Sequence, residues 1–246
     1  MDLITGTLAL RPYVFAFLVL FLVAGSLDVG WRRTLIFGAT VWPVAWLAEF
    51  ASTRVGFPFG LYHYTGITRG RELYIGDVPF MDSLSFTFLA YASFCLARAT
   101  LAGRRAPRWT PAVVTGLLMT ALDVVIDPLA VRGDRWFLGR IFYYPDGGAY
   151  FGVPLSNFAG WTLVGATCVG LYLTIAGGVS AGRVWPGVGL YYVVLGFNLA
   201  VTAWIREWVL LTLGALLHAV IAVAIRRTRP APGKVVGPER PGVQRA

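Results

Sequence analysis

The sequence of 246 residues is poor in charge and in the residue types that build common metal and covalent sites. Only 13% of its residues are charged, whereas soluble domains carry about a quarter. Its two cysteines and two histidines form no CxxC or HxxxH spacing, so neither a disulfide framework nor a zinc site is indicated. The single lysine, Lys234, lies close to the C-terminus. This position excludes a retinal Schiff base on a lysine within a helix.

Nucleotide and nucleic-acid chemistry also lack support. The sequence has no Walker loop and no GxGxxG after a predicted strand, so no phosphate-binding loop is indicated. The net charge of +9 and the pI near 10.0 could indicate a nucleic-acid partner. However, the basic residues are spread over many connections rather than gathered on one face, so we expect no nucleic-acid binding.

Apolar residues are abundant instead. They make up 57% of the chain, and the mean hydropathy is +0.67. Apolar runs of about 18 residues or more can cross a bilayer as helices. The predicted spans are residues 8–27, 35–50, 74–97, 111–131, 155–179, 184–205 and 208–225. We therefore expect an all-α, polytopic transmembrane bundle of about seven helices.

The predicted spans make one transmembrane domain, residues 1–225. The segment 226–246 is rich in Pro, Gly and Arg and is predicted to be a disordered basic tail. The first run could be a signal peptide, but Asp2 weakens its basic start, so a retained helix is favoured. More arginines fall on the tail's side of the bundle than on the other, which predicts a cytoplasmic C-terminus. The sequence gives no indication of the oligomeric state.

Acidic and amide side chains gather at one end of the predicted bundle, which we call its outer side. In chain order they include Glu49, Asp77, Asp82, Asp123, Asp127, Asn157 and Asn198. The two longest connections, 51–73 and 132–154, lie on this side and are rich in Gly, Pro and aromatic residues. An ionisable group costs about 2.5–3.5 kcal/mol at the centre of a span and usually faces a cavity or a partner. Several at one end indicate a pocket.

Asp123 and Asp127 are four residues apart, so they lie on one face of a helix. Pro128 follows them, and the helix is expected to end or kink there. Two carboxyl groups close together in a poorly solvated place cannot both ionise easily, so one can stay protonated and act as an acid. The alternative interpretation is that Asp127 pairs with Arg132 or Arg135 and only anchors the helix end.

Aromatic side chains crowd the two long outer connections. They are Phe57, Phe59, Tyr62, Tyr64, Tyr143, Tyr144, Tyr150, Phe151 and Trp161. They could belong to an interfacial belt, line a slot for a long apolar molecule, or face a cation with their rings. Away from this side, the isolated His218 is expected to form a hydrogen bond within the bundle.

Four segments give the sequence a recognisable character: AEFASTRVGFPFGLYHYTG, LYIGDVPF, LDVVIDPLAVRGDRW and AYFGVPLSNFAGW. In this order they resemble the signatures of the carotenoid biosynthesis membrane family, whose members include the CruF-type carotenoid hydratases. The resemblance runs from about residue 42 to residue 161, about half of the chain. The segments before and after it match only in character.

The resemblance implies a cofactor-independent enzyme of a bacterial plasma membrane, with no metal site. It would add water across the terminal C1,C2 double bond of an acyclic carotenoid end, such as that of lycopene, and form a tertiary alcohol. Its partners would be the carotenoid, water and membrane lipid. Glu49, Asp123, Asp127, Asn157, Tyr62, Tyr64 and Trp161 fall within the matching motifs. We take Asp123, Asp127 and Glu49 as the candidate catalytic residues. The candidate substrate-binding residues are Asn157, Tyr62, Tyr64, Trp161, Phe59 and, with less weight because the family often differs there, Asp82.

In this hypothesis the aspartate pair protonates the alkene, aromatic rings stabilise the cation, and Glu49 with the amide of Asn157 positions and deprotonates water. Two other functions stay open. One is a non-catalytic carotenoid- or isoprenoid-binding membrane protein. The other is an isoprenoid cyclase or a prenyltransferase. Prenyltransferases usually need aspartate-rich magnesium sites, for which the single DVVID segment is thin support.

Overall fold

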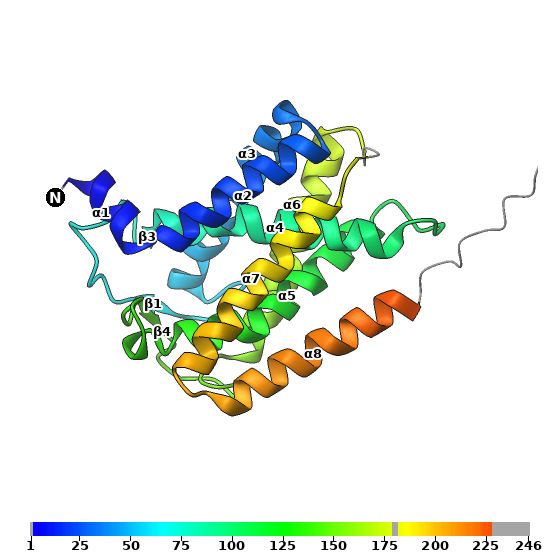
Figure 1. The fold of residues 1–246 in the computed structure, drawn as a ribbon. Helices are drawn as coiled ribbons and strands as arrows, with labels where there is room; N and C mark the ends of the chain where they lie inside the picture. The colour runs from blue at the N-terminus through cyan, green and yellow to red at the C-terminus, as the bar shows by residue number, and fades with distance from the viewer. Residues whose placement is uncertain (1, 179–181, 228–246) are drawn as a thin grey trace, which may run out of the picture.

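The computed structural model describes residues 2–178 and 182–227, and this part of the chain is mainly helical (Figure 1). The helices are α1 Leu3–Leu10, α2 Pro12–Asp28, α3 Trp31–Val55, α4 Phe80–Leu101, α5 Thr110–Ala130, α6 Leu155–Ile175, α7 Trp185–Trp204 and α8 Trp208–Arg227. The six helices from α3 to α8 are long and apolar enough to cross a membrane. The predicted all-α polytopic bundle is confirmed.

The first predicted span, 8–27, is not one straight helix. Helices α1 and α2 are long and apolar enough to cross a membrane only when they are taken together, and they meet at 87°. The break falls between Leu10 and Pro12. Proline lacks the backbone N–H that would continue α1, but it fits the first turn of a new helix. The predicted number of about seven spans holds if this bent pair is counted as one.

Two other predicted spans have different boundaries. The start of 74–97 is a hairpin, in which β2 Tyr74–Ile75 pairs with β3 Val78–Pro79 before α4 begins. Gly76 in its turn has a φ of +64°, which glycine adopts without strain. The span predicted at 35–50 is longer than expected, because α3 extends beyond it at both ends. The predicted tail lies outside the described residues from position 228 onward.

Helix α4 is the centre of the bundle. In its most apolar stretch 78% of residues are buried, against 17% for α8. Helix α4 contacts α2, α3, α5, α6 and α7, whereas α8 lies along α5 and α7 at the edge (Figure 1).

Small residues let α5 and α6 approach each other closely. A Cβ atom at Gly116 would lie 2.2 Å from the carbonyl oxygen of Thr162, and Gly165 faces α5 in the same way. Such small-residue contacts are typical of helix pairs in membranes. The close approach brings the end of α5, with Asp127, against the beginning of α6, with Asn157.

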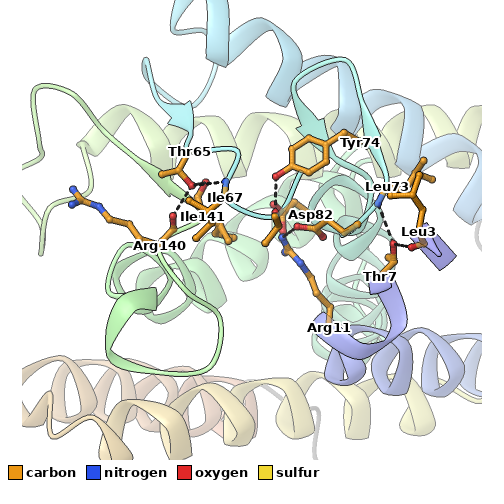
Figure 2. A network of polar contacts seen from close by, with 12 residues as sticks. Leu3, Thr7, Arg11, Thr65, Ile67, Leu73, Tyr74, Asp82, Arg140 and Ile141 are labelled. Carbon is orange, nitrogen blue, oxygen red and sulfur yellow. Dashed lines mark hydrogen bonds and ion pairs between the residues drawn. The ribbon is translucent and has the colours of Figure 1, made fainter. Parts of the chain in front are cut away.

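The two long connections, 56–79 and 131–154, join each other. Strand β1 His63–Tyr64 pairs antiparallel with β4 Phe142–Tyr143. The backbone N–H of Thr65 donates to the carbonyl of Ile141 at 2.8 Å, and its hydroxyl donates to the carbonyl of Arg140 at 2.7 Å (Figure 2). The predicted pair of outer loops therefore forms one continuous cap at one end of the bundle.

Ion pairs join both ends of α2 to α4. Arg11, just before α2, pairs with Asp82 in the first turn of α4. Asp28, the last residue of α2, pairs with Arg98 near the end of α4 and accepts a hydrogen bond from the Tyr91 hydroxyl at 2.7 Å. The two helices therefore run parallel.

Candidate active site

A cavity of about 130 Å³ lies between the helix ends and the cap. The polar groups on its wall include Glu49, Tyr62, Tyr64, Asp82, Asp127, Tyr144, Asn157 and Asn198. Most of the remaining wall is apolar, with Phe59, Phe86 and Trp161 among the rings. An apolar hollow with a few converging polar groups is typical of a small-molecule site.

The aspartate pair on α5 meets α6 through one amide. The Asn157 side-chain nitrogen donates to Oδ2 of Asp123 at 2.7 Å and to Oδ2 of Asp127 at 2.8 Å. The indole N–H of Trp161 donates to the same oxygen of Asp127 at 3.3 Å. Both pairs of residues are spaced by four, so each pair lies on one face of its helix. The two carboxyl groups are therefore fixed side by side.

The two aspartates differ in their access to the cavity. Asp127 lines it, whereas Asp123 is 0% exposed and lies behind Asp127 and Asn157. Within the described part of the chain, Oδ1 of Asp123 has no hydrogen-bond partner. A group in contact with the cavity can reach a bound molecule directly, and a group behind it acts through its neighbour.

The alternative role of Asp127, as the partner of an arginine at the helix end, is wrong. Arg132 and Arg135 both bind the carboxylate of Glu207 instead, and the Nε atom of Arg132 lies 3.2 Å from it. Asp127 is engaged by an amide and an indole. The helix continues past Pro128 and ends at Ala130.

Glu49 faces the same cavity from α3. Its side chain is buried, with the residue only 5% exposed. Among the residues that the structure describes, none forms a hydrogen bond with its Oε2 atom. The Tyr64 side chain lies close enough to interact with both Glu49 and Asp82. A buried carboxyl oxygen without a partner is costly and is common at functional sites.

Asp82 is held by a guanidinium group. Arg11 pairs with Oδ1 of Asp82 (Figure 2). It also pairs, at 2.9 Å, with Oε1 of Glu72 in the cap. The side chains of Arg11 and Glu72 are 3% and 0% exposed. A guanidinium fork can hold two carboxylates in a fixed geometry. This ion-pair group ties the α1–α2 corner to α4 and to the cap.

Aromatic rings form a continuous part of the wall. Trp161 stacks on Phe86 with ring centroids 4.4 Å apart and an interplanar angle of 13°. Phe59 lies against both rings. On the cap side, Tyr62 packs against the rings of Tyr64, Phe142 and Tyr144.

Three cap tyrosines that line the cavity, Tyr62, Tyr64 and Tyr144, are neutral phenols. Burial, with a smaller contribution from the nearby Glu49 charge, raises the pKa of Tyr62 and of Tyr64 well above its ordinary value. Burial also raises the pKa of Tyr144. Their hydroxyl groups therefore keep their protons at any physiological pH.

The structure brings the predicted site residues together. The lining residues among them are Glu49, Phe59, Tyr62, Tyr64, Asp82, Asp127, Asn157 and Trp161. Asp123 stands directly behind the wall. Their chemical roles stay predictions.

Sequence reasoning missed Arg11, Glu72 and Phe86. Arg11 lies inside the predicted span 8–27 and was given no role there, although a lone arginine next to a proline within an apolar stretch was a usable signal. Glu72 lies 61 residues away from its partner, and nothing local marks it. Phe86 could not be told from any other apolar residue of α4.

Comparison with known proteins relates the chain to one protein family. The profile of a family described as carotenoid biosynthesis protein matches residues 5–225, well beyond the segment that carried the resemblance. A bisanhydrobacterioruberin hydratase from Haloarcula japonica is 31% identical over 174 residues, which cover 69% of this chain and 56% of that protein. No solved structure matches the chain significantly. Its segments, its helical bundle and the profile match together show that the chain belongs to the carotenoid biosynthesis protein family.

Proposed function

We propose that the protein is a cofactor-independent carotenoid hydratase. It adds water to the terminal C1,C2 double bond of an acyclic carotenoid end and forms a tertiary alcohol. The family and the name of the related hydratase support the substrate class and the type of reaction. The cavity supports the chemistry, because carboxyl groups lie against an aromatic wall. Addition of water causes no net oxidation or reduction, so the proposal invokes no cofactor.

The observation that carries the proposal is the arrangement of Asp123, Asn157 and Asp127. An acid that protonates an alkene must be neutral and kept from bulk water. Two buried carboxyl groups that share one amide donor form a place where a single proton can be retained. We assign the proton donor to Asp127, which lines the cavity, and a supporting role to Asp123.

The reaction then follows in two steps. The O–H bond of Asp127 breaks as the alkene electron pair forms a C2–H bond, which leaves a tertiary cation at C1. The rings of Trp161 and Phe86 face the cavity and can stabilise this cation by about 2 kcal/mol or more. A water oxygen forms the C1–O bond, and its proton passes to a carboxylate, for which Glu49 is the candidate. Return of that proton to Asp127 completes the cycle.

Phe59, Tyr62, Tyr64 and Trp161 are proposed to contact the polyene end, because their rings form the wall. Asn157 was grouped with them in the sequence analysis. Its hydrogen bonds to both aspartates favour a role in holding the acid.

We also propose that the protein spans a bacterial plasma membrane with its C-terminus in the cytoplasm. The excess of arginines on the tail's side supports this orientation. The cap and the cavity would then lie toward the outer surface.

The test is expression in a host that accumulates lycopene, followed by chromatography and mass spectrometry of the carotenoids. The wild-type protein should yield a product heavier by one or two water molecules. Asp127→Asn should retain bound carotenoid but lose at least about 100-fold in rate, the lower range for a general acid. Asp134→Asn is the matched control, because Asp134 is exposed in the cap and should have no effect.

Other results would replace the proposal. A bound but unchanged carotenoid with the wild-type protein indicates a binding protein. A cyclic product of unchanged mass indicates a cyclase, and activity that depends on magnesium and a prenyl diphosphate indicates a prenyltransferase. Normal alcohol yield from Asp127→Asn would remove this residue from the mechanism.

A further inference from the structure

Two carboxyl oxygens of the cavity lining have no hydrogen-bond partner in the part of the chain that the structure describes. Within residues 2–178 and 182–227, neither Oε2 of Glu49 nor Oδ2 of Asp82 has a hydrogen-bond partner, and both atoms are buried. Both residues line the same cavity, and Tyr64 lies next to both. A water molecule is stable in a buried site when it has two to four polar partners. These two acceptors and the Tyr64 hydroxyl supply such a set.

Asp82 is oriented for this purpose by its other oxygen. Arg11 holds Oδ1 of Asp82 (Figure 2). Its second terminal nitrogen holds Glu72. An ion pair with a guanidinium is an interaction of the charged carboxylate. Asp82 is thus fixed through Oδ1, and Oδ2 is left for another group.

The water cannot depend on the amide N–H groups of Asn157. The nitrogen of that amide already donates to Asp123 and to Asp127, which uses both of its hydrogens. The polar wall therefore has two separate parts. In one part, neutral hydrogen-bond donors on α6 hold the aspartate pair on α5. In the other part, Arg11 holds the carboxylates of Asp82 on α4 and Glu72 in the cap, and Glu49 on α3 faces the same cavity.

We infer that the water that captures the cation binds between Glu49 and Asp82, and that Arg11 is a positioning residue acting through Asp82. The inference rests on the proposed hydratase function and deepens it. Asp82 is surrounded by charged and titratable groups from several elements: Arg11, Tyr13, Glu49, Tyr64, Glu72, Tyr74 and Asp127. This inference assigns Asp82 to water binding, whereas the sequence analysis predicted that it binds substrate.

The step in which water adds to the cation is balanced in atoms and protons. The water oxygen donates an electron pair to C1, one O–H bond breaks, and the proton goes to Glu49 or Asp82. This proton replaces the one that Asp127 gave to C2, so a transfer across the cavity restores the starting state. No other reactant is needed.

The first experiment uses purified full-length protein in lipid nanodiscs. Asp82→Asn keeps the size of the side chain, and we expect kcat to fall about 100-fold with little change in KM. Asp82→Ala opens a space beside Arg11, and sodium formate should restore part of its lost rate by occupying that space. Asp82→Leu, which fills the space, should not respond to formate. A wild-type rate in Asp82→Asn, or a loss in Asp82→Ala that formate does not reverse, overturns the inference.

The second experiment tests Arg11. Lysine keeps the charge but is a single point charge that cannot hold two carboxylates in fixed geometry. We expect Arg11→Lys to lower kcat without weakening carotenoid binding, and Arg11→Met to lower it further. If the Asp82 variants do not accumulate as folded protein, the Arg11→Lys variant tests the inference by itself. Loss of carotenoid binding in step with activity in Arg11→Lys would show a structural role only and overturn the inference. A wild-type protein that makes no alcohol would contradict the proposed function itself.

Discussion

At the scale of single residues, Trp161 contributes to the site both a hydrogen-bond donor and an aromatic ring, and substitutions can separate the two. Its indole N–H binds Asp127 at 3.3 Å, and its ring stacks on Phe86 beside the cavity. Phenylalanine at this position would keep an aromatic face and lose the donor. Leucine would lose both.

We therefore expect Trp161→Leu to form the alcohol about 10- to 30-fold more slowly than Trp161→Phe, which corresponds to about 2 kcal/mol of cation–π stabilisation. The measurement is initial rate at saturating carotenoid, with bound carotenoid and thermal stability compared in parallel. Equal rates in the two variants would show that the ring face does not stabilise the transition state.

The site residues were predictable to different degrees. The acids and aromatics stood out because polar groups at the end of apolar spans are costly, and the structure gathers them around one cavity. The prediction for His218 is confirmed, since it contacts the Tyr191 hydroxyl at 3.2 Å and the Gly214 carbonyl at 2.9 Å. The partners of Arg11 and Asp28 were not predictable, because each pair joins residues about 60 to 70 positions apart and leaves no local pattern.

At the scale of elements, the contact between α5 and α6 determines where the acid pair meets its amide. Gly116→Ala would put a methyl group 2.2 Å from the Thr162 carbonyl oxygen, so the helices must separate. We expect a loss of stability of about 1–3 kcal/mol, as for other overpacked sites, and a lower kcat. Thermal unfolding in detergent and the hydration rate measure the two effects.

Gly196→Ala on α7 is the matched control, because no atom lies within 4 Å of its added Cβ. It should be as stable as the wild type or slightly more stable, since alanine favours the helix. If Gly116→Ala behaves like this control, the close approach of α5 and α6 is not required for the site.

The elements could be predicted where hydropathy alone decides. The predicted spans for α5 to α8 were nearly correct. A long apolar run can cross a membrane in few ways other than as a helix. Hydropathy did not indicate the corner at Pro12 or the hairpin at Tyr74–Pro79, since each lies within a run that is apolar on average despite a single charge, Arg11 or Asp77. The pairing of β1 with β4 joins two-residue strands from distant loops, for which the sequence carries no signal.

At the scale of the whole molecule, the orientation in the membrane can be tested with introduced cysteines. Both natural cysteines are buried, so their background reaction should be small. Asp134 in the cap and Arg105 between α4 and α5 are exposed at opposite ends of the bundle. We expect a membrane-impermeant maleimide to label Asp134→Cys in intact cells, and to label Arg105→Cys only after the cells are opened. The reverse pattern would place the cap in the cytoplasm.

The ion pairs at the two ends of α2 have opposite polarity. The arginine is on α2 at the cap end and on α4 at the other end. A slide by one helical turn would separate all four charges in an apolar environment, so the register is fixed by electrostatics as well as by packing. Inversion of α2 relative to α4 would be even less favourable. An inverted α2 would place Arg11 next to Arg98 and Asp28 next to Asp82, which replaces two attractions with two repulsions.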